Sequence, residues 1–357
     1  MNLDDFNAFT RLDPQNMRGE IDGLPDQLQI AWELGSRQPL PDWTEIRQVI
    51  ITGMGGSAIA ADLFAVYAAP SCSVPIFAHR DYHLPAWSQG AHTLVIASSH
   101  SGNTEETLGS FQQAVERGCR CLAITTGGEL AQAARAASVP VWSFEHAGQP
   151  RAAVGFSFGL LLAAFARLNL LDDLSNSAAH LAEAVEAMRQ QQEHLRAEIP
   201  AALNPAKRYA GQFVGRWVVV FGADLMAPVA RRWKGQINEL AKAMAAFEFL
   251  PEADHNTLAG SLNPEELLAR TMMLFLRAPS NHPRNSLRVE LTRKSLMLEG
   301  LNTDFYEAHG ETPLAQLWTA LHFGDYLAYY LAMAYGVDPT PVEALENFKA
   351  EMRSAGQ

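Results

Sequence analysis

Apolar runs of strand length recur along the first 150 residues, and each ends at small polar residues. Amphipathic stretches with the helical period of 3.6 residues separate these runs. The runs cover residues 48–52, 74–78, 93–97, 121–126 and 139–144. Strands that alternate with helices predict an α/β domain with a parallel sheet, and such sheets bind ligands at the carboxyl ends of their strands.

Two loops at these carboxyl ends have the composition of a phosphate site. Residues 98–104 read Ser-Ser-His-Ser-Gly-Asn-Thr, and residues 53–57 read Gly-Met-Gly-Gly-Ser; each precedes a predicted helix. A helix start offers unpaired N–H groups and partial positive charge, and glycine lets the backbone approach a ligand closely. The glycine spacing differs from that of a dinucleotide-binding loop. We predict that both loops bind one phosphate; the alternatives are a well-capped helix and tight strand-to-helix packing.

The second half of the chain repeats this order weakly. The repeated segments are residues 216–223 with 47–54, residues 272–277 with 94–98, and the long apolar helix 317–334 with the helix after Arg151. A polar helical segment from Asp172 to about Glu198 connects the halves, and residues 278–283 replace the serine-rich loop. We therefore predict two similar domains, residues 1–190 and 191–357, of which only the first is equipped for phosphate.

Composition narrows the class of protein. A chain of 357 residues with 48% hydrophobic and 18% charged residues has enough apolar material for two folded domains, so disorder is excluded. The net charge of −12, without a basic run, argues against a nucleic-acid partner. The longest apolar stretch, residues 154–166, is too short to cross a membrane. The N-terminus is acidic and unlike a signal peptide, and the three cysteines form no CxxC pair, which indicates a cytoplasmic protein with reduced thiols.

Four side chains are candidates for chemistry on residue type and position. Arg151 follows a strand on the ligand side of the sheet, so an active-site role is plausible. Glu239 and Lys242 lie three residues apart on a predicted helix, where a solvent-exposed ion pair is the simpler explanation. His255 lies in a polar loop, and a lone loop histidine is more often solvated than catalytic.

Six segments in order carry a specific family resemblance. The chain resembles the bifunctional phosphoglucose/phosphomannose isomerases of the SIS (sugar isomerase) superfamily along nearly its whole length. Leu240 departs from the family, which usually has Asn beside the catalytic Glu, and His100 departs where an aromatic residue is common; both are expected to alter substrate preference. The matching segments are residues 53–57, 99–107, 149–153, 234–242, 251–256, and 337–341 with Lys349.

The resemblance implies two SIS-type domains, each a parallel β-sheet flanked by helices, and a reversible aldose–ketose isomerisation. Glucose 6-phosphate and mannose 6-phosphate would interconvert with fructose 6-phosphate. It assigns Glu239 as the base that moves a proton between C1 and C2 through a cis-enediol, and His255 as the group that opens the sugar ring. Arg151 would stabilise the enediolate oxygen, and Lys349 would assist ring opening.

The resemblance also implies a set of phosphate ligands and a partner. No cofactor and no metal are required, and a homodimer is expected in which His255 is donated across the interface. The residues expected to hold the phosphate are Gly56, Ser57, Ser99, Ser101 and Thr104.

Other classes of protein remain open at this stage. A non-catalytic sugar-phosphate sensor would keep the serine-rich loop but would not need Glu239, Arg151 and His255. Another sugar-phosphate isomerase, or an amino-sugar enzyme, would share the fold; an aminotransferase of this type normally needs a glutamine-hydrolysing domain with an N-terminal Cys nucleophile, which this sequence lacks. A zinc-dependent phosphomannose isomerase is disfavoured, because no His/Glu cluster has metal-ligand spacing.

Overall fold

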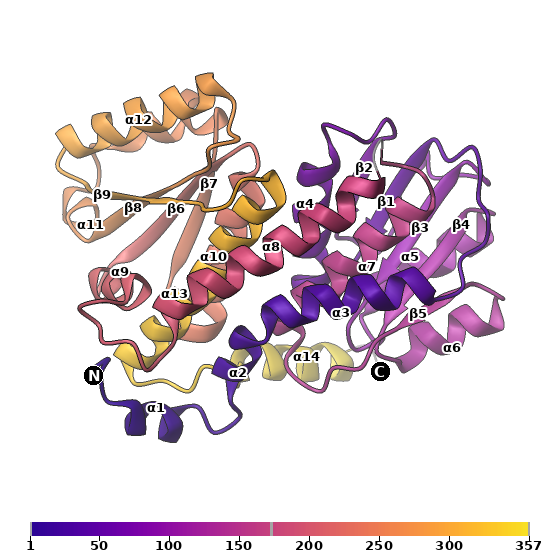
Figure 1. The fold of residues 1–357 in the computed structure, drawn as a ribbon, viewed down its shortest axis with the longest axis horizontal. Helices are drawn as coiled ribbons and strands as arrows, with labels where there is room; N and C mark the ends of the chain where they lie inside the picture. The colour runs from indigo at the N-terminus through magenta and orange to yellow at the C-terminus, as the bar shows by residue number, and fades with distance from the viewer. Residues whose placement is uncertain (1, 172–173, 356–357) are drawn as a thin grey trace.

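The computed structural model describes residues 2–171 and 174–355 and shows two halves, each built around one parallel sheet (Figure 1). The first sheet has the strand order β2-β1-β3-β4-β5. Every strand overlaps one of the predicted apolar runs, so the predicted parallel α/β architecture is confirmed. The strands are β1 (Gln48–Thr52), β2 (Ile76–His79), β3 (Thr93–Ser98), β4 (Arg120–Thr125) and β5 (Val141–Ser143).

Helices cover both faces of the first sheet. One face packs against α3, α4 and α7, and the other packs against α5 and α6. Every residue from Val154 to Ala166 is buried, which agrees with the prediction of a buried helix there. The helices are α3 (Leu24–Arg37), α4 (Gly55–Ala68), α5 (Glu105–Glu116), α6 (Gly128–Ala136) and α7 (Val154–Arg167).

The second sheet repeats the order of the first with one strand fewer, β7-β6-β8-β9. Its strands are β6 (Trp217–Ala223), β7 (Ala245–Leu250), β8 (Thr271–Arg277) and β9 (Asn302–Glu307). Helices α10 (Met226–Ala241) and α13 (Pro313–Tyr335) pack on one face and α12 (Pro283–Leu298) on the other. The central strands β6 and β8 were predicted, whereas β7 and β9 were not, because these edge strands are only partly buried and lack a continuous apolar run.

The two halves are joined by helices that cross between them. Helix α8 (Leu174–Leu195) packs along α13 and also contacts α3. The predicted domain boundary between residues 190 and 191 falls within α8 and stays a prediction; Asp172, where the connecting segment was predicted to begin, lies outside the described residues. The N-terminal helices α1 (Phe6–Leu12) and α2 (Met17–Asp22) lie against the second half, where Phe9 contacts the ring of Tyr329.

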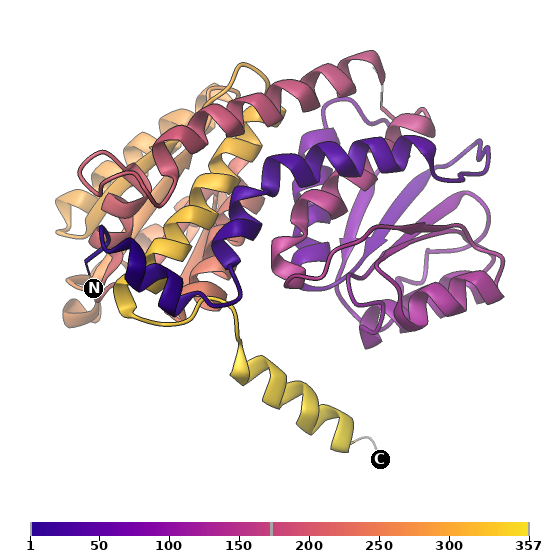
Figure 2. The same ribbon diagram turned by 60° about the horizontal axis from the view of Figure 1, so that its bottom comes forward.

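The C-terminal helix α14 (Glu343–Ala355) projects away from both halves (Figure 2). All of its described residues are exposed, and Leu345, Phe348 and Met352 form an apolar stripe at helical spacing. No helix in the described part of the chain is long and apolar enough to cross a membrane. The remaining helical segments are α9 (Pro205–Phe213), α11 (Glu265–Leu268), η1 (Pro150–Ala152), η2 (Glu252–His255) and η3 (Thr257–Gly260).

Candidate active site

Two helix N-termini meet at the carboxyl edge of the first sheet. Strands β1 and β3 are hydrogen-bonded neighbours, and α4 and α5 begin directly after them. Met54 and Thr104 are the N-cap residues, and neither side chain caps its helix with a hydrogen bond. The first N–H groups of both helices are therefore directed at this edge of the sheet without a side-chain acceptor, which suits a phosphate.

The serine-rich loop is closed by bonds between its own residues. The hydroxyls of Ser99 and Thr104 lie 2.9 Å apart, and the backbone N–H of Gly102 donates to the Ser99 hydroxyl oxygen. The Ser101 oxygen accepts from the backbone N–H of Asn103 at 3.2 Å, which leaves its hydroxyl hydrogen to donate. Ser99 is buried and Ser101 is exposed, so the loop presents Ser101 to solvent while Ser99 holds the turn.

Glycines allow both loops to pack closely against their neighbours. A Cβ atom at Gly102 would lie 1.9 Å from the carbonyl oxygen of Gly127, so only glycine fits there. A Cβ atom at Gly56 would lie 2.5 Å from the carbonyl oxygen of Pro150 and 3.3 Å from the Cα atom of Arg151. The loop that contains Gly56 and the buried Ser57 is thus in direct contact with the segment that carries Arg151.

Arg151 and Glu239 are brought together from opposite halves. Nη1 of Arg151 lies 3.7 Å from Oε2 of Glu239, and Arg151 is only 5% exposed. The guanidinium also donates to the side chain of Gln149 and to the backbone carbonyls of Pro339 and Thr340. Burial lowers the pKa of Arg151, and the carboxylate of Glu239 opposes this shift. The pair places a fixed cation beside a carboxylate that is about one-third exposed and open to a ligand.

Lys242 is near enough to Arg151 and Glu239 to interact with their charges, but its contacts differ from those that the sequence predicted. Its ammonium group donates to the backbone carbonyls of Glu239 and Leu240, so the expected ion pair with the Glu239 carboxylate is not formed. Lys242 has a left-handed backbone (φ 53°) at the end of α10. Burial and the positive charge of Arg151 lower the pKa of Lys242 to about 8, against the opposing fields of Asp338 and Glu239.

Leu240 lies in the hydrophobic core. Its side chain is fully buried, packed in the cluster around α10 and α13. An Asn at this position would place an amide among apolar side chains, which accounts for the apolar residue here.

His255 and Lys349 are exposed, and neither forms a hydrogen bond or ion pair with Arg151 or Glu239 among the described residues. Glu239 is close to the beginning of β7, whereas His255 follows its end. Five steps along β7, each of about 3.3 Å, separate the two ends by roughly 17 Å. Lys349 lies on the projecting helix α14, whose Glu346 is near enough to influence the pKa of Arg151.

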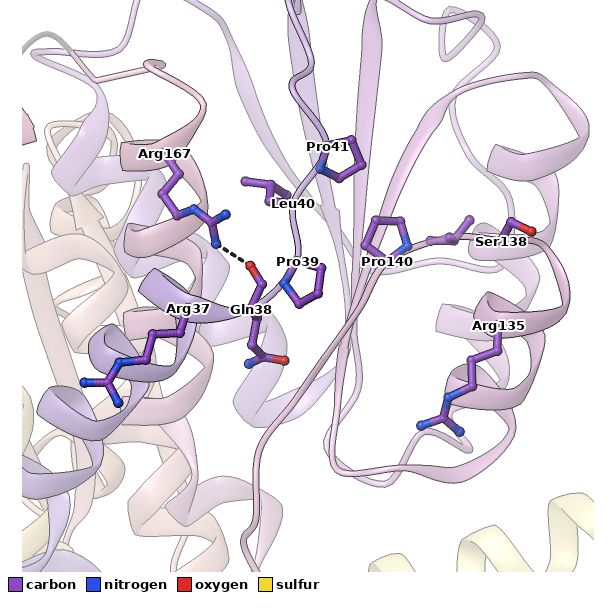
Figure 3. A pocket seen from close by; sticks show the side chains of 10 residues that line it. Arg37, Gln38, Pro39, Leu40, Pro41, Arg135, Ser138, Pro140 and Arg167 are labelled. Atoms are coloured by element: carbon purple, nitrogen blue, oxygen red, sulfur yellow. Dashed lines mark hydrogen bonds between the residues drawn. The ribbon is translucent and has the colours of Figure 1, made fainter.

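The opposite edge of the first sheet carries a surface pocket of about 710 Å³ (Figure 3). It is bordered by the segments before β1 and β5, and Arg167 donates a hydrogen bond to the carbonyl of Gln38 there. Because these segments precede the strands, the pocket lies away from the carboxyl edge. In residues 2–171 and 174–355, no group of three or more His, Cys, Asp or Glu side chains has an arrangement that would hold a metal ion.

Comparisons with known proteins agree with this architecture. Residues 202–352 match the family model of the bacterial phospho-glucose isomerase C-terminal SIS domain. The fold is similar to that of a hypothetical protein from Thermus thermophilus, with a TM-score of 0.72, 17% sequence identity, and coverage of 98% of this chain and 94% of the other.

Two relatives show the family. The bifunctional phosphoglucose/phosphomannose isomerase of Caldicellulosiruptor bescii is 36% identical over 333 residues, 92% of this chain and 96% of the relative. The protein of the same name from Aquifex aeolicus is 33% identical over 330 residues, 91% of this chain and 95% of the relative. The chain therefore belongs to the bifunctional phosphoglucose/phosphomannose isomerase family of SIS-domain proteins.

Proposed function

We propose that this protein interconverts glucose 6-phosphate and mannose 6-phosphate with fructose 6-phosphate. Family membership supports an isomerase rather than a sensor or another sugar-phosphate enzyme. The observation that carries the proposal is the Arg151–Glu239 pair, which is in contact with a loop that opens an uncapped helix. A phosphate site, a base and a fixed cation are the parts that the proton transfer between C1 and C2 requires, and ring opening is assigned to His255 and Lys349.

In the proposed reaction, the phosphate is held at the two loops and does no chemistry. Gly56 and Ser57 from one loop, and Ser99, Ser101 and Thr104 from the other, position the sugar so that its C1–C2 edge meets Glu239. The Glu239 carboxylate removes the C2 proton of the open-chain aldose and returns it to C1, while the hydroxyl proton at O2 passes to O1 and leaves the carbonyl at C2. The negative charge that develops on the oxygen at C1 lies beside the guanidinium of Arg151. Proton return to opposite faces of C2 gives the two C2 epimers, which requires the cis-enediol to turn about its C2–C3 bond so that either face meets Glu239.

The proposed site is shared between two subunits of a homodimer. Within one chain, β7 separates His255 from Glu239, so His255 is poorly placed to serve its own Glu239. A two-fold dimer gives each site the histidine of its partner. The exposed apolar stripe on α14 also favours a partner surface, which would order Lys349 near the site where it is proposed to assist ring opening.

We also place the protein in the cytoplasm. Burial raises the pKa of the Cys121 thiol to about 12, so this thiol stays protonated and unreactive. No disulfide joins Cys119 to Cys121 in the described structure. This cysteine usage suits a reducing compartment.

A coupled assay tests the reaction. Purified protein is given fructose 6-phosphate, and formation of glucose 6-phosphate and of mannose 6-phosphate is followed separately, with and without EDTA. We expect both aldoses to form at rates that survive the chelator. Binding without turnover would identify a sensor, and loss of activity with EDTA that zinc restores would contradict the metal-free reaction.

Complementation tests the shared site. Inactive Glu239→Gln and inactive His255→Ala chains are mixed under conditions of subunit exchange. About half of randomly paired dimers are mixed, and one of their two sites is intact, so about a quarter of wild-type activity should return. If mass measurement confirms exchange and no activity returns, both residues serve one site from the same chain.

A further inference from the structure

Three titratable side chains form a hydrogen-bonded chain that ends in the serine-rich loop. Nε2 of His100 lies 2.9 Å from Nδ1 of His146, and Nε2 of His146 lies 2.8 Å from Oε2 of Glu20. The three residues come from the loop after β3, the segment after β5, and α2. The two bonded pairs are 46 and 126 residues apart in sequence, so only the fold brings them together.

The hydrogen-bonded chain of His100, His146 and Glu20 is largely buried. The side chain of His146 is 7% exposed, and that of Glu20 is 27% exposed. The ring of His100 packs against Phe144, which stacks on Phe156. Two hydrogen bonds from Thr126 to the His100 carbonyl hold the backbone of His100. The geometry of the chain is therefore fixed by packing.

The hydrogen bonds determine which ring nitrogens carry protons. A carboxylate only accepts, so Glu20 takes its bond from Nε2–H of His146. Nδ1 of a neutral His146 must then accept from Nε2–H of His100, which leaves Nδ1 of His100 with a lone pair. No described residue bonds to this Nδ1, and it is not among the fully enclosed polar atoms that lack a partner. Ser99 and Ser101, on either side of His100 in the loop, are proposed phosphate ligands.

We propose that this chain makes His100 a substrate-binding residue that takes up one proton from solvent when a phosphate dianion binds at the serine-rich loop. This inference rests on the proposed phosphate site. Nδ1 of His100 gains the proton and donates to a phosphate oxygen. Nε2–H of His100 stays hydrogen-bonded to Nδ1 of His146, and the added positive charge is stabilised through this chain by Glu20. His146 and Glu20 thus act as positioning residues for His100.

The pKa of His100 in the unliganded protein agrees with this proposal. Burial and the neighbouring His146 lower the pKa of His100 to about 4, and Glu20 opposes them. His100 is therefore neutral near pH 6 in the empty site, and an incoming dianion favours its protonated form. The titratable or charged groups on the surrounding elements are Arg18, Glu20 and Asp22 on α2, Glu145 and His146 after β5, Glu129 and Arg135 on α6, and Arg151 on η1.

Calorimetry with sulfate tests the proton uptake. Sulfate is a dianion that does not titrate near neutral pH, so any proton exchanged belongs to the protein. Binding enthalpies in buffers of different ionisation enthalpy give the number of protons taken up. Near pH 6, roughly two units above the pKa of about 4 of His100 in the empty site, the ring starts neutral, so we expect sulfate binding to be accompanied by net proton uptake. Sulfate binding without proton uptake would overturn the inference.

Two variants separate substrate contact from loop support. His100→Asn keeps a polar group near the position of Nδ1 but cannot reach His146, whereas His100→Gln keeps a group near Nε2 and leaves nothing at Nδ1. We expect His100→Gln to abolish the uptake and weaken sulfate about tenfold, more than His100→Asn does, because a charge-assisted bond is lost. The reverse order would show that His100 only supports the loop.

Controls distinguish failure of this inference from failure of the phosphate site. His92→Phe removes a histidine at the other end of β3, where Nδ1 bonds the carbonyl of Glu45, and should change neither uptake nor affinity. Ser101→Ala should weaken sulfate. If Ser101→Ala has no effect and sulfate does not compete with fructose 6-phosphate, the phosphate site itself is wrong. If Ser101→Ala weakens sulfate and His100→Gln takes up protons as the wild type does, only the histidine chain is refuted.

Discussion

The second sheet has the strand order of the first with one strand fewer, but the groups at the carboxyl edges of the two sheets differ. At the first edge, α4 and α5 begin without side-chain caps, and their N–H groups are open to a ligand. At the second edge, Asp224 follows β6 and its carboxylate accepts from the backbone N–H of His282 and from the side chain of Asn285 at the start of α12. In the second half an aspartate accepts from groups at a helix start, whereas the first edge, where we propose that phosphate binds, has no such side-chain cap on α4 or α5.

In the proposed reaction, the second half contributes the base from the other end of its sheet. Helix α10 packs antiparallel to α4, with the Arg231–Asp62 ion pair at one end and Glu239 beside Arg151 at the other. The proposed base therefore lies at the C-terminal end of α10, close to the beginning of β7. In the proposed site, one architecture used twice supplies phosphate binding from helix starts and a proton acceptor from a helix end.

The largest expected effect comes from removing the proposed base. Glu239→Gln preserves size and hydrogen bonding but cannot take a proton, so turnover should fall by at least roughly 10²-fold with little change in KM. Steady-state kinetics in both directions measure this, and Glu193→Gln, an exposed carboxylate on α8, is the control. Near-normal turnover in a folded Glu239→Gln protein would move the base elsewhere.

Removing the aspartate that fills the second edge should cost stability and spare activity. Asp224→Ala loses two hydrogen bonds and places Ala at a φ of 49°, so the free energy of unfolding should fall by about 2–3 kcal/mol. Asp224→Asn keeps one acceptor and tolerates this backbone, so its loss should be about 1 kcal/mol. Urea unfolding at one protein concentration measures both. Wild-type stability in Asp224→Ala would show that the carboxylate does not fill this helix start.

A matched pair of serines tests the difference between the edges directly. Ser101→Ala in the first half should weaken competitive inhibition by inorganic phosphate about tenfold, because a hydroxyl donor to a charged ligand is lost. Ser280→Ala, in the exposed loop after β8, should leave the inhibition constant unchanged. Equal effects of the two substitutions would remove the proposed asymmetry.

The smallest expected effect concerns Lys242. Its pKa of about 8 lies below the usual lysine value, so the side chain loses its proton, and the site loses positive charge, as pH rises through 8. KM for the sugar phosphate should therefore rise about two- to threefold between pH 7 and pH 9, a modest change because the side chain is partly exposed. Lys242→Arg, which stays protonated, should not show this rise. An identical pH profile in the two proteins would exclude Lys242 as its source.

Patterns along the chain were enough to predict the central strands, the buried helix after Arg151 and the two polar loops. Apolar runs and helical periodicity indicate how a segment is buried, so β1, β3, β6 and β8 could be predicted from them. The edge strands β7 and β9 were missed because a strand covered on fewer sides does not need a continuous apolar run. The family resemblance, rather than periodicity, identified Glu239 as a candidate.

Which distant side chains come into contact depends on the tertiary structure. It placed Glu239 against Arg151 across the two halves, directed Lys242 to backbone carbonyls, and joined His100 to His146 and Glu20. It also separated Glu239 from His255, although they are close in sequence, because β7 runs between them. Local sequence patterns indicate how each element is buried, but the contacts between elements depend on how helices and sheets pack. A charge or proton-transfer site assembled from several elements has no pattern along the chain.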